Sequence, residues 1–211
     1  MRLILASTSP RRRSLLSLLG IEFEVCDPGC DEAVIPGLRP EELACHYAQR
    51  KAHGVSSKHH DAVVLGSDTL IDLEGSALGK PAHLEEAREM LRRLAGRGHA
   101  VHTAVTLSCL SRLTETTQLS TARVWMKAYD ASRHEHYLAT GDSLGKAGAY
   151  SIQGAGAELI ERIEGDFTTI VGLPLRLVAK LLREVGVEVP ADIEALYAAK
   201  PFENWASFSE R

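Results

Sequence analysis

Hydrophobic and polar residues follow one another along the chain in blocks whose spacing changes from short apolar runs to helical stripes. The first block, residues 2–6, is an apolar run that predicts a buried strand. A helix is predicted next, with Ser9 as its N-cap, Pro10 at its first position, an apolar stripe over 15–19 and a stop at Gly20. The backbone N–H groups of this helix N-terminus are therefore expected to face whatever lies beyond the strand.

The rest of the pattern mixes strands and helices. Strands are predicted at 21–25 and 62–65, an antiparallel pair at 99–109 and 117–127, and a hairpin at 70–73 that turns at Glu74-Gly75. Helices are predicted from Pro40 to about His53, at 83–95, at 130–139 and from Leu175 to about Val185. This order predicts an α/β fold with a mixed, twisted central sheet and flanking helices. We expect one domain of two lobes over 1–187 and a peripheral tail over 188–211.

Composition narrows the function classes. The chain has 211 residues, 45% hydrophobic and 25% charged, as in ordinary globular proteins. A net charge of -4 and a pI near 6.1 give no sign of the basic surface that duplex nucleic acid requires, so no nucleic-acid partner is expected. Because no apolar run suits a signal peptide or a membrane span, we expect a soluble cytoplasmic protein with no membrane partner. The irregular spacing of the four cysteines (Cys26, Cys30, Cys45 and Cys109) favours free thiols.

The first chemically suggestive cluster is the turn that contains Ser7, Ser9, Arg11, Arg12 and Arg13. Hydroxyls, free backbone donors and guanidinium groups meet there at the positive end of a helix dipole. Because arginines in the first turn oppose that dipole, a bound polyanion explains their placement; a solvated basic turn is the alternative. Arg13 is the arginine expected to face solvent.

Carboxylates are the second element of the predicted site. Asp68, in Gly66-Ser67-Asp68-Thr69, is placed at the end of an apolar strand, where catalytic residues of α/β sheets concentrate. It suits a Mg²⁺ ligand or the acceptor of a proton from water, although Asp-Thr is also a common turn and capping pair. Asp31-Glu32 in an early acidic loop offers a second carboxylate pair, or only a solvated loop.

Lysines and an amide complete the set. Lys51 lies late in a predicted helix, Lys80 is enclosed by Gly79 and Pro81, and Lys146 begins a small-residue segment. Lysines are ordinarily surface residues, and only the neighbouring Gly and Pro distinguish Lys80 and Lys146. Gln153 has the donor and acceptor that a nucleobase edge requires, but a capping or packing role is equally open. The chain has no P-loop, nucleophile elbow or H-E-x-x-H motif.

Together these segments resemble the Maf family, once described as septum formation inhibitors and understood as house-cleaning nucleotide pyrophosphatases. The resemblance runs from Leu3 to about Val185 and rests on eight motifs in chain order: Ser7 to Arg12, Asp31-Glu32, Arg50-Lys51-Ala52, Gly66 to Thr69, Gly79-Lys80-Pro81, Lys146 to Tyr150, Ile152-Gln153-Gly154 and Val171 to Pro174. It implies a deep cleft between two lobes, a nucleoside triphosphate substrate, a divalent metal (Mg²⁺ or Mn²⁺) and a homodimer. It also implies that Asp68 is the proton acceptor and Glu32 a metal or water partner.

The resemblance further implies a pyrimidine substrate. Three positions have the residue types typical of the branch that hydrolyses dTTP and UTP, rather than those of the 7-methyl-GTP branch: Arg11, Thr69 and Gln153. Two positions depart from the pattern: Ser67 replaces the usual Ala, and Gly145 stands where an acidic residue often precedes Lys-Ala-Gly. Another nucleotide, such as 7-methyl-GTP, inosine triphosphate or a modified uridine nucleotide, is the alternative substrate.

A function without hydrolysis is the remaining alternative. A septum-formation regulator that acts through partners predicts a functional surface away from Asp68, for example in the tail. Three aromatic residues there suit such a surface, or dock the tail on the body: Phe202, Trp205 and Phe208.

Overall fold

A mixed seven-stranded sheet forms the centre of the computed structural model, which describes residues 1–30, 35 and 37–208. The strand order is β2-β1-β3-β5-β6-β7, and β4 pairs with β3 off this path. β1 runs parallel to β2 and β3, whereas the other pairs are antiparallel. The predicted mixed α/β fold is therefore confirmed. The strands are β1 Leu3–Ala6, β2 Glu24–Cys26, β3 Val63–Leu73, β4 Ser76–Leu78, β5 Gly98–Cys109, β6 Thr114–Met126 and β7 Ile160–Glu164.

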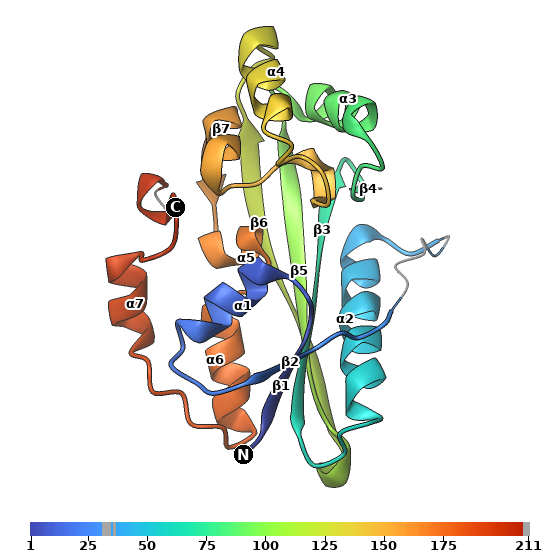
Figure 1. Cartoon of the computed structure of the whole chain (residues 1–211), viewed down its shortest axis with the longest axis vertical. Helices are drawn as coiled ribbons and strands as arrows, with labels where there is room; N and C mark the ends of the chain where they lie inside the picture. The colour runs from blue at the N-terminus through green and yellow to red at the C-terminus, as the bar shows by residue number, and fades with distance from the viewer. Residues whose placement is uncertain (31–34, 36, 209–211) are drawn as a thin grey trace.

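Helices cover both faces of the sheet and one end of it. In Figure 1 the long strands β3, β5 and β6 run the length of the molecule, with α3 and α4 at one end, α2 beside the other end, and α1, α6 and α7 across from α2. Within the described residues, no helix is long and apolar enough to cross a membrane. The helices are α1 Pro10–Ser17, α2 Pro40–Ser56, α3 Leu84–Leu94, α4 Ala131–Ala139, α5 Phe167–Val171, α6 Leu175–Glu184 and α7 Ile193–Ala199, with 3₁₀ turns η1 Leu110–Arg112, η2 Ala147–Ala149, η3 Gly154–Leu159 and η4 Trp205–Ser207.

The start of α1 follows the local signals of the sequence. The side chain of Ser9 caps the helix by accepting a hydrogen bond from the backbone N–H of Arg12, and Pro10 occupies the first turn. β2 is shorter and later than the predicted strand at 21–25. Only Ile4–Ala6 of the four-residue β1 pairs with β2, so there is no ladder for residues 21–23, which pack on the core through Ile21 and Phe23 instead.

The main difference from the sequence prediction lies in β3. A strand at 62–65, a polar turn and a separate hairpin arm were expected, but one eleven-residue strand runs from Val63 to Leu73. The reason is β5, which pairs with β3 continuously from Val64 opposite Ser108 to Asp72 opposite Ala100. Asp68 therefore lies in the middle of β3 and not at its end.

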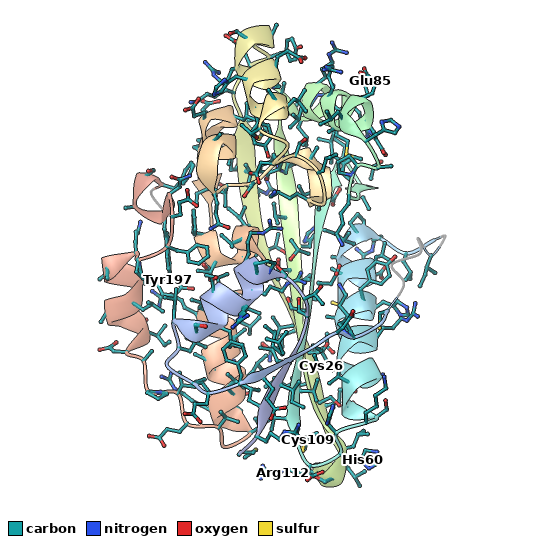
Figure 2. The ribbon with its side chains drawn as sticks, viewed as in Figure 1. Cys26, His60, Glu85, Cys109, Arg112 and Tyr197 are labelled. Atoms are coloured by element: carbon teal, nitrogen blue, oxygen red, sulfur yellow. The ribbon has the colours of Figure 1, made fainter. Side chains whose placement is uncertain are left out.

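The C-terminal segment packs on the body through aromatic rings. Trp205 is fully buried, with its ring stacked 5.5 Å from that of Phe167 and edge-on to that of Tyr197 at 4.9 Å. Figure 2 shows Tyr197 extending from α7 toward the body, where its hydroxyl donates to Asp166 at 2.8 Å. Phe208 is also buried. The docking interpretation of Trp205 and Phe208 is thus confirmed, and neither offers an exposed surface to a partner.

The four cysteines are free thiols. Figure 2 shows two of them: Cys26 is the last residue of β2, and Cys109 is the last residue of β5.

Candidate active site in a gap at the sheet edge

A gap in strand pairing lies beside a cavity of the described structure. β1 pairs with β3 only as far as Ala6 opposite Gly66, and β4 pairs with β3 only from Ile71 onward. Among the described residues, no strand pairs with 67–70 of β3 on this side, although β5 pairs with them on the other. A cavity of about 410 Å³ lies at this gap, bordered by the segments that follow β1 and β4.

Most of the predicted site residues line this one cavity. Ser7, Ser9, Arg11 and Arg12 line it from the turn between β1 and α1. The others that line it are Lys51 from α2, Asp68 and Thr69 from β3, Lys80 after β4, and Lys146 before η2. Because the turn, the strand and three separate lysines converge, the juxtaposition that the sequence predicted is present.

One predicted residue, Gln153, is not placed in the cavity, and another, Glu32, is not described. Gln153 is half-buried just before η3 and is not among the described lining residues; its backbone N–H donates to Ser151 Oγ at 3.1 Å. Glu32, with Asp31, lies outside the described residues. Among the described residues of that early loop, the acid Asp27 lines the cavity, and its Oδ1 accepts from the Gly29 backbone at 2.9 Å.

Asp68 and Lys51 form a buried ion pair at the cavity wall. Lys51 Nζ lies 2.5 Å from Asp68 Oδ1, and the two residues are 6% and 4% exposed. Gly66 makes this approach possible, because a Cβ there would lie 2.7 Å from the Ala52 nitrogen and closer still to the Ala48 carbonyl oxygen. The bare backbone at Gly66 thus lets α2 pack against β3 and bring Lys51 to Asp68.

Arg12 is held in a fixed position by three acceptors. Its Nε donates to the Gly172 carbonyl at 2.9 Å, one terminal nitrogen donates to Thr69 Oγ1 at 3.1 Å, and the other reaches Ser7 Oγ at 3.5 Å. Thr69 is fixed in turn by Thr103, whose hydroxyl oxygen lies 2.9 Å away. Thr69 therefore positions Arg12, a role that the sequence interpretation of Thr69 as a base reader did not include. Arg13 is exposed, as predicted.

Arg11 and Lys146 share an acidic neighbour that sequence reasoning missed. Lys146 Nζ donates to Asp142 Oδ1 at 2.6 Å, and its side chain is nearly buried. Burial lowers the pKa of Arg11, and the nearby charge of Asp142 opposes that shift. Asp142 thus partly neutralises this side of the cavity, although Gly145 stands where an acidic residue often precedes Lys-Ala-Gly.

Part of the cavity wall comes from elements that the sequence did not predict. Ile170 and Val171 of α5 line it, beside Tyr150. The signals of α5 were present: the Asp166 side chain caps it at the Thr168 N–H, and Gly172 ends it with φ of 117°. Behind the wall, His99 Nε2 lies 2.7 Å from the Tyr150 hydroxyl, and burial lowers the pKa of His99 to about 4.

The donor set of the cavity suits a polyphosphate with a hard divalent cation. Cationic side chains and helix N–H groups attract phosphate oxygens, while the Asp68 carboxylate is the type of ligand that Mg²⁺ and Mn²⁺ prefer. The two alternatives, a solvated basic turn and an Asp-Thr capping pair, do not account for the convergence of these charged side chains on one cavity.

Comparison with known proteins identifies the family. Residues 2–185 match the family described as Maf-like protein. The chain belongs to the Maf family. Curated relatives named dTTP/UTP pyrophosphatase include that of Pelotomaculum thermopropionicum, 43% identical over 89% of this chain and 98% of the relative. Those of Thermotoga maritima and Thermus thermophilus are 44% and 45% identical, over 88% and 85% of this chain and 90% and 92% of theirs.

The fold is also found outside the Maf family. The Ham1 protein of Staphylococcus aureus aligns with a TM-score of 0.53 at 12% identity, over 88% of this chain and all of that one. All of the cavity lining, from Ser7 to Val171, lies inside the Maf match, whereas α7 and η4 follow it. The site is therefore built from the shared Maf region, and the tail is an addition that packs on it.

Proposed function

We propose that this protein is a nucleoside triphosphate pyrophosphatase that converts dTTP and UTP to the monophosphate and pyrophosphate. The observation that carries the proposal is the buried carboxylate of Asp68, which lines a cavity together with cationic side chains. The names of the curated relatives support the substrate, because they are called dTTP/UTP pyrophosphatases and share over 40% identity across most of their length. We also propose a house-cleaning role with an effect on cell division.

The triphosphate lies across the turn between β1 and α1. The fixed guanidinium of Arg12 and the N–H groups at the start of α1 bind phosphate oxygens, and Lys80 approaches from the segment after β4. Because Gly172 and Thr69 hold Arg12 before the substrate arrives, little ordering cost falls on binding.

Asp68 acts as the general base. Its carboxylate accepts a proton from a water molecule as that water attacks the α-phosphorus, and the bond from the α-phosphorus to the bridging oxygen breaks. Pyrophosphate takes the electron pair of that bond, and the lysines and arginines of the cavity neutralise the charge that develops. Asp68, with Glu32 as a further ligand, would hold a divalent cation, which neutralises phosphate oxygens and lowers the pKa of bound water.

Base selection is assigned to Arg11, Thr69 and Gln153. Thr69 contributes through the position of Arg12, and Gln153 reads the base edge from the segment that follows Tyr150 and Ser151 at the cavity wall. A site that hydrogen-bonds a pyrimidine edge rejects other bases because its own polar groups are then left unpaired.

The test is pyrophosphate release from a panel of triphosphates: dTTP, UTP, CTP, ATP, 7-methyl-GTP and inosine triphosphate, with Mg²⁺ and with Mn²⁺. We expect dTTP and UTP to be the best substrates and Asp68→Asn to lose at least about a hundredfold in turnover while remaining folded. The matched control is Glu74→Gln, which changes an exposed acid in the turn after β3. Near-normal turnover by Asp68→Asn would remove the proposed base, and preference for a purine would reassign the substrate.

Three further properties remain predictions of the same proposal: dependence on Mg²⁺ or Mn²⁺, a homodimer and a cytoplasmic location. Chelation with metal add-back tests the first, and the mass of the protein in solution tests the second.

A further inference from the structure

A second group of potential metal ligands lies on the same face of the sheet as Asp68 but outside the cavity. Glu41 is in the first turn of α2, Asp72 is near the end of β3, and His102 is on β5. One ligand atom from each residue lies within 4.8 Å of the others. The register of β3 and β5 brings His102 close to Asp72. His102 is opposite Leu70 and is therefore diagonal to Asp72 on one face of the sheet.

This group is separate from the candidate active site. Asp68 and Asp72 point to the same face of β3 with Leu70 between them, which places them about 13 Å apart at roughly 3.3 Å per residue. Neither Glu41, Asp72 nor His102 is among the described residues that line the cavity. An ion bound here would not touch a triphosphate bound beside Asp68.

The environment of the His102 side chain also supports a role as a metal ligand. The residue is 8% exposed, and its Nδ1 lies 2.9 Å from the hydroxyl of Thr121 on the neighbouring strand. Its other ring nitrogen, Nε2, is buried without a hydrogen-bond partner among the described residues. With Nδ1–H donating to Thr121, the lone pair of Nε2 faces the two carboxylates, which is the arrangement of a metal-binding histidine.

The separation of the His102 and Asp72 ligand atoms fits a shared ion better than a direct bond. His102 Nε2 lies 3.5 Å from Asp72 Oδ2. A charge-assisted hydrogen bond between them would be near 2.8 Å, so 3.5 Å is too long. Two ligands about 2.1 Å from one metal ion, at a roughly tetrahedral angle, are about 3.4 Å apart.

Outer contacts hold both carboxylates in place. The second oxygen of Asp72, Oδ1, accepts from the Gly75 backbone N–H at 2.6 Å. Glu41 Oε1 lies 2.8 Å from a guanidinium nitrogen of Arg39. Such contacts orient metal ligands and are a regular part of metal sites.

We propose that Glu41, Asp72 and His102 bind one divalent transition-metal ion of the Zn²⁺ type, with water completing its coordination. An imidazole nitrogen beside two carboxylates favours such an ion over Mg²⁺, which prefers oxygen ligands alone. The ion would tie the start of α2 to β3 and β5. Because α2 also carries Lys51, it would stabilise the packing on which the Lys51–Asp68 pair depends without entering the reaction.

The experiment is a calorimetric titration of ZnCl₂ into the full-length, chelator-treated protein. It is carried out in the Asp68→Asn background, so that zinc binding at the proposed catalytic carboxylate does not contribute and hydrolysis is not the readout. We expect one equivalent of Zn²⁺ to bind and to raise the unfolding temperature, and equimolar Mg²⁺ not to displace it. His102→Gln should weaken Zn²⁺ binding about a hundredfold or more and abolish the thermal shift.

Controls separate this site from adventitious binding and from misfolding. His136→Gln removes an exposed histidine of α4 and should leave Zn²⁺ affinity unchanged. If His102→Gln does not fold, Glu41→Gln replaces it, because Glu41 is only half-buried at a helix end. Absence of stoichiometric Zn²⁺ binding, or equal affinity in the parent and in the Glu41 or His102 variant, would overturn the proposal. The outcome does not depend on whether dTTP is the substrate.

Discussion

The ammonium nitrogen of Lys51 lies 2.5 Å from Asp68 Oδ1, and both side chains are almost fully shielded from water. Each charge compensates the desolvation of the other, and the pair joins α2 to the middle of β3. In the proposed reaction, Lys51 also orients Asp68 before substrate binds.

Replacing Lys51 alone should therefore leave the buried carboxylate of Asp68 without its ammonium partner. We expect Lys51→Met to lower the free energy of unfolding by roughly 3 kcal/mol at neutral pH, measured by urea denaturation. The double variant Lys51→Met/Asp68→Asn should recover most of that loss, because neither of its two replacement side chains carries a charge. If the double variant is as unstable as the two single losses added together, the coupling between these residues is refuted.

Gly66 provides a test of the packing that brings the pair together. A methyl group there would collide with the backbone of α2 at Ala48 and Ala52. We expect Gly66→Ala to destabilise the fold by about 1–3 kcal/mol and to reduce turnover, because α2 must move away from Asp68. Gly79→Ala is the matched control, since a Cβ at Gly79 meets nothing within 4 Å. Equal melting temperatures for the two variants would contradict this account.

Local signals account for the parts of the fold that the sequence predicted well. The Ser9 cap, the first-turn proline and the apolar stripe of α1 act within a few residues, so they can be read without knowledge of the rest of the chain. The motif residues can also be recognised from short stretches of sequence. In the structure, the turn after β1 and residues 67–70 of β3 border the same gap in the sheet.

Long-range pairing decided what the sequence could not reveal. The continuation of β3 through Asp68 depends on β5, which lies about thirty residues later, and strand patterns carry no information about that partner. The Thr69 hydroxyl contacts Arg12 and Thr103, which come from segments far apart in the chain, so the sequence does not reveal that Thr69 also positions Arg12. The Glu41, Asp72 and His102 group was missed for the same reason, because only register and helix packing bring it together.

The contact of Thr69 with Arg12 predicts a specific kinetic effect. Thr69→Val keeps the shape of the side chain but removes the oxygen that accepts from Arg12 at 3.1 Å. Because Gly172 still holds Nε, we expect Arg12 to loosen but not to leave, and KM for dTTP to rise about five- to tenfold with a smaller change in kcat. Thr69→Ser retains the hydroxyl and should behave nearly as the parent. An unchanged KM in Thr69→Val would mean that this hydroxyl does not position a substrate-binding arginine.

His99 predicts a loss of stability in mild acid. Burial lowers its folded-state pKa to about 4, whereas a histidine in the unfolded chain titrates near 6.5. Below about pH 6.5 the unfolded chain binds a proton that the folded protein does not accept. The contribution of His99 therefore favours unfolding progressively as pH falls from about 6.5 to about 4, and becomes constant below that range. The slope for one such group approaches 1.4 kcal/mol per pH unit at its steepest.

The measurement is urea denaturation at several pH values across that window, for the parent, for His99→Gln and for the exposed His136→Gln. Glutamine retains a hydrogen-bonding group for the Tyr150 hydroxyl, which lies 2.7 Å from His99 Nε2, but it does not titrate. The pH slope should therefore decrease in His99→Gln and remain unchanged in His136→Gln, whatever the other histidines contribute. Identical slopes in all three proteins would show that His99 is protonated equally in the folded and unfolded states, and the buried neutral imidazole behind Tyr150 would have to be abandoned.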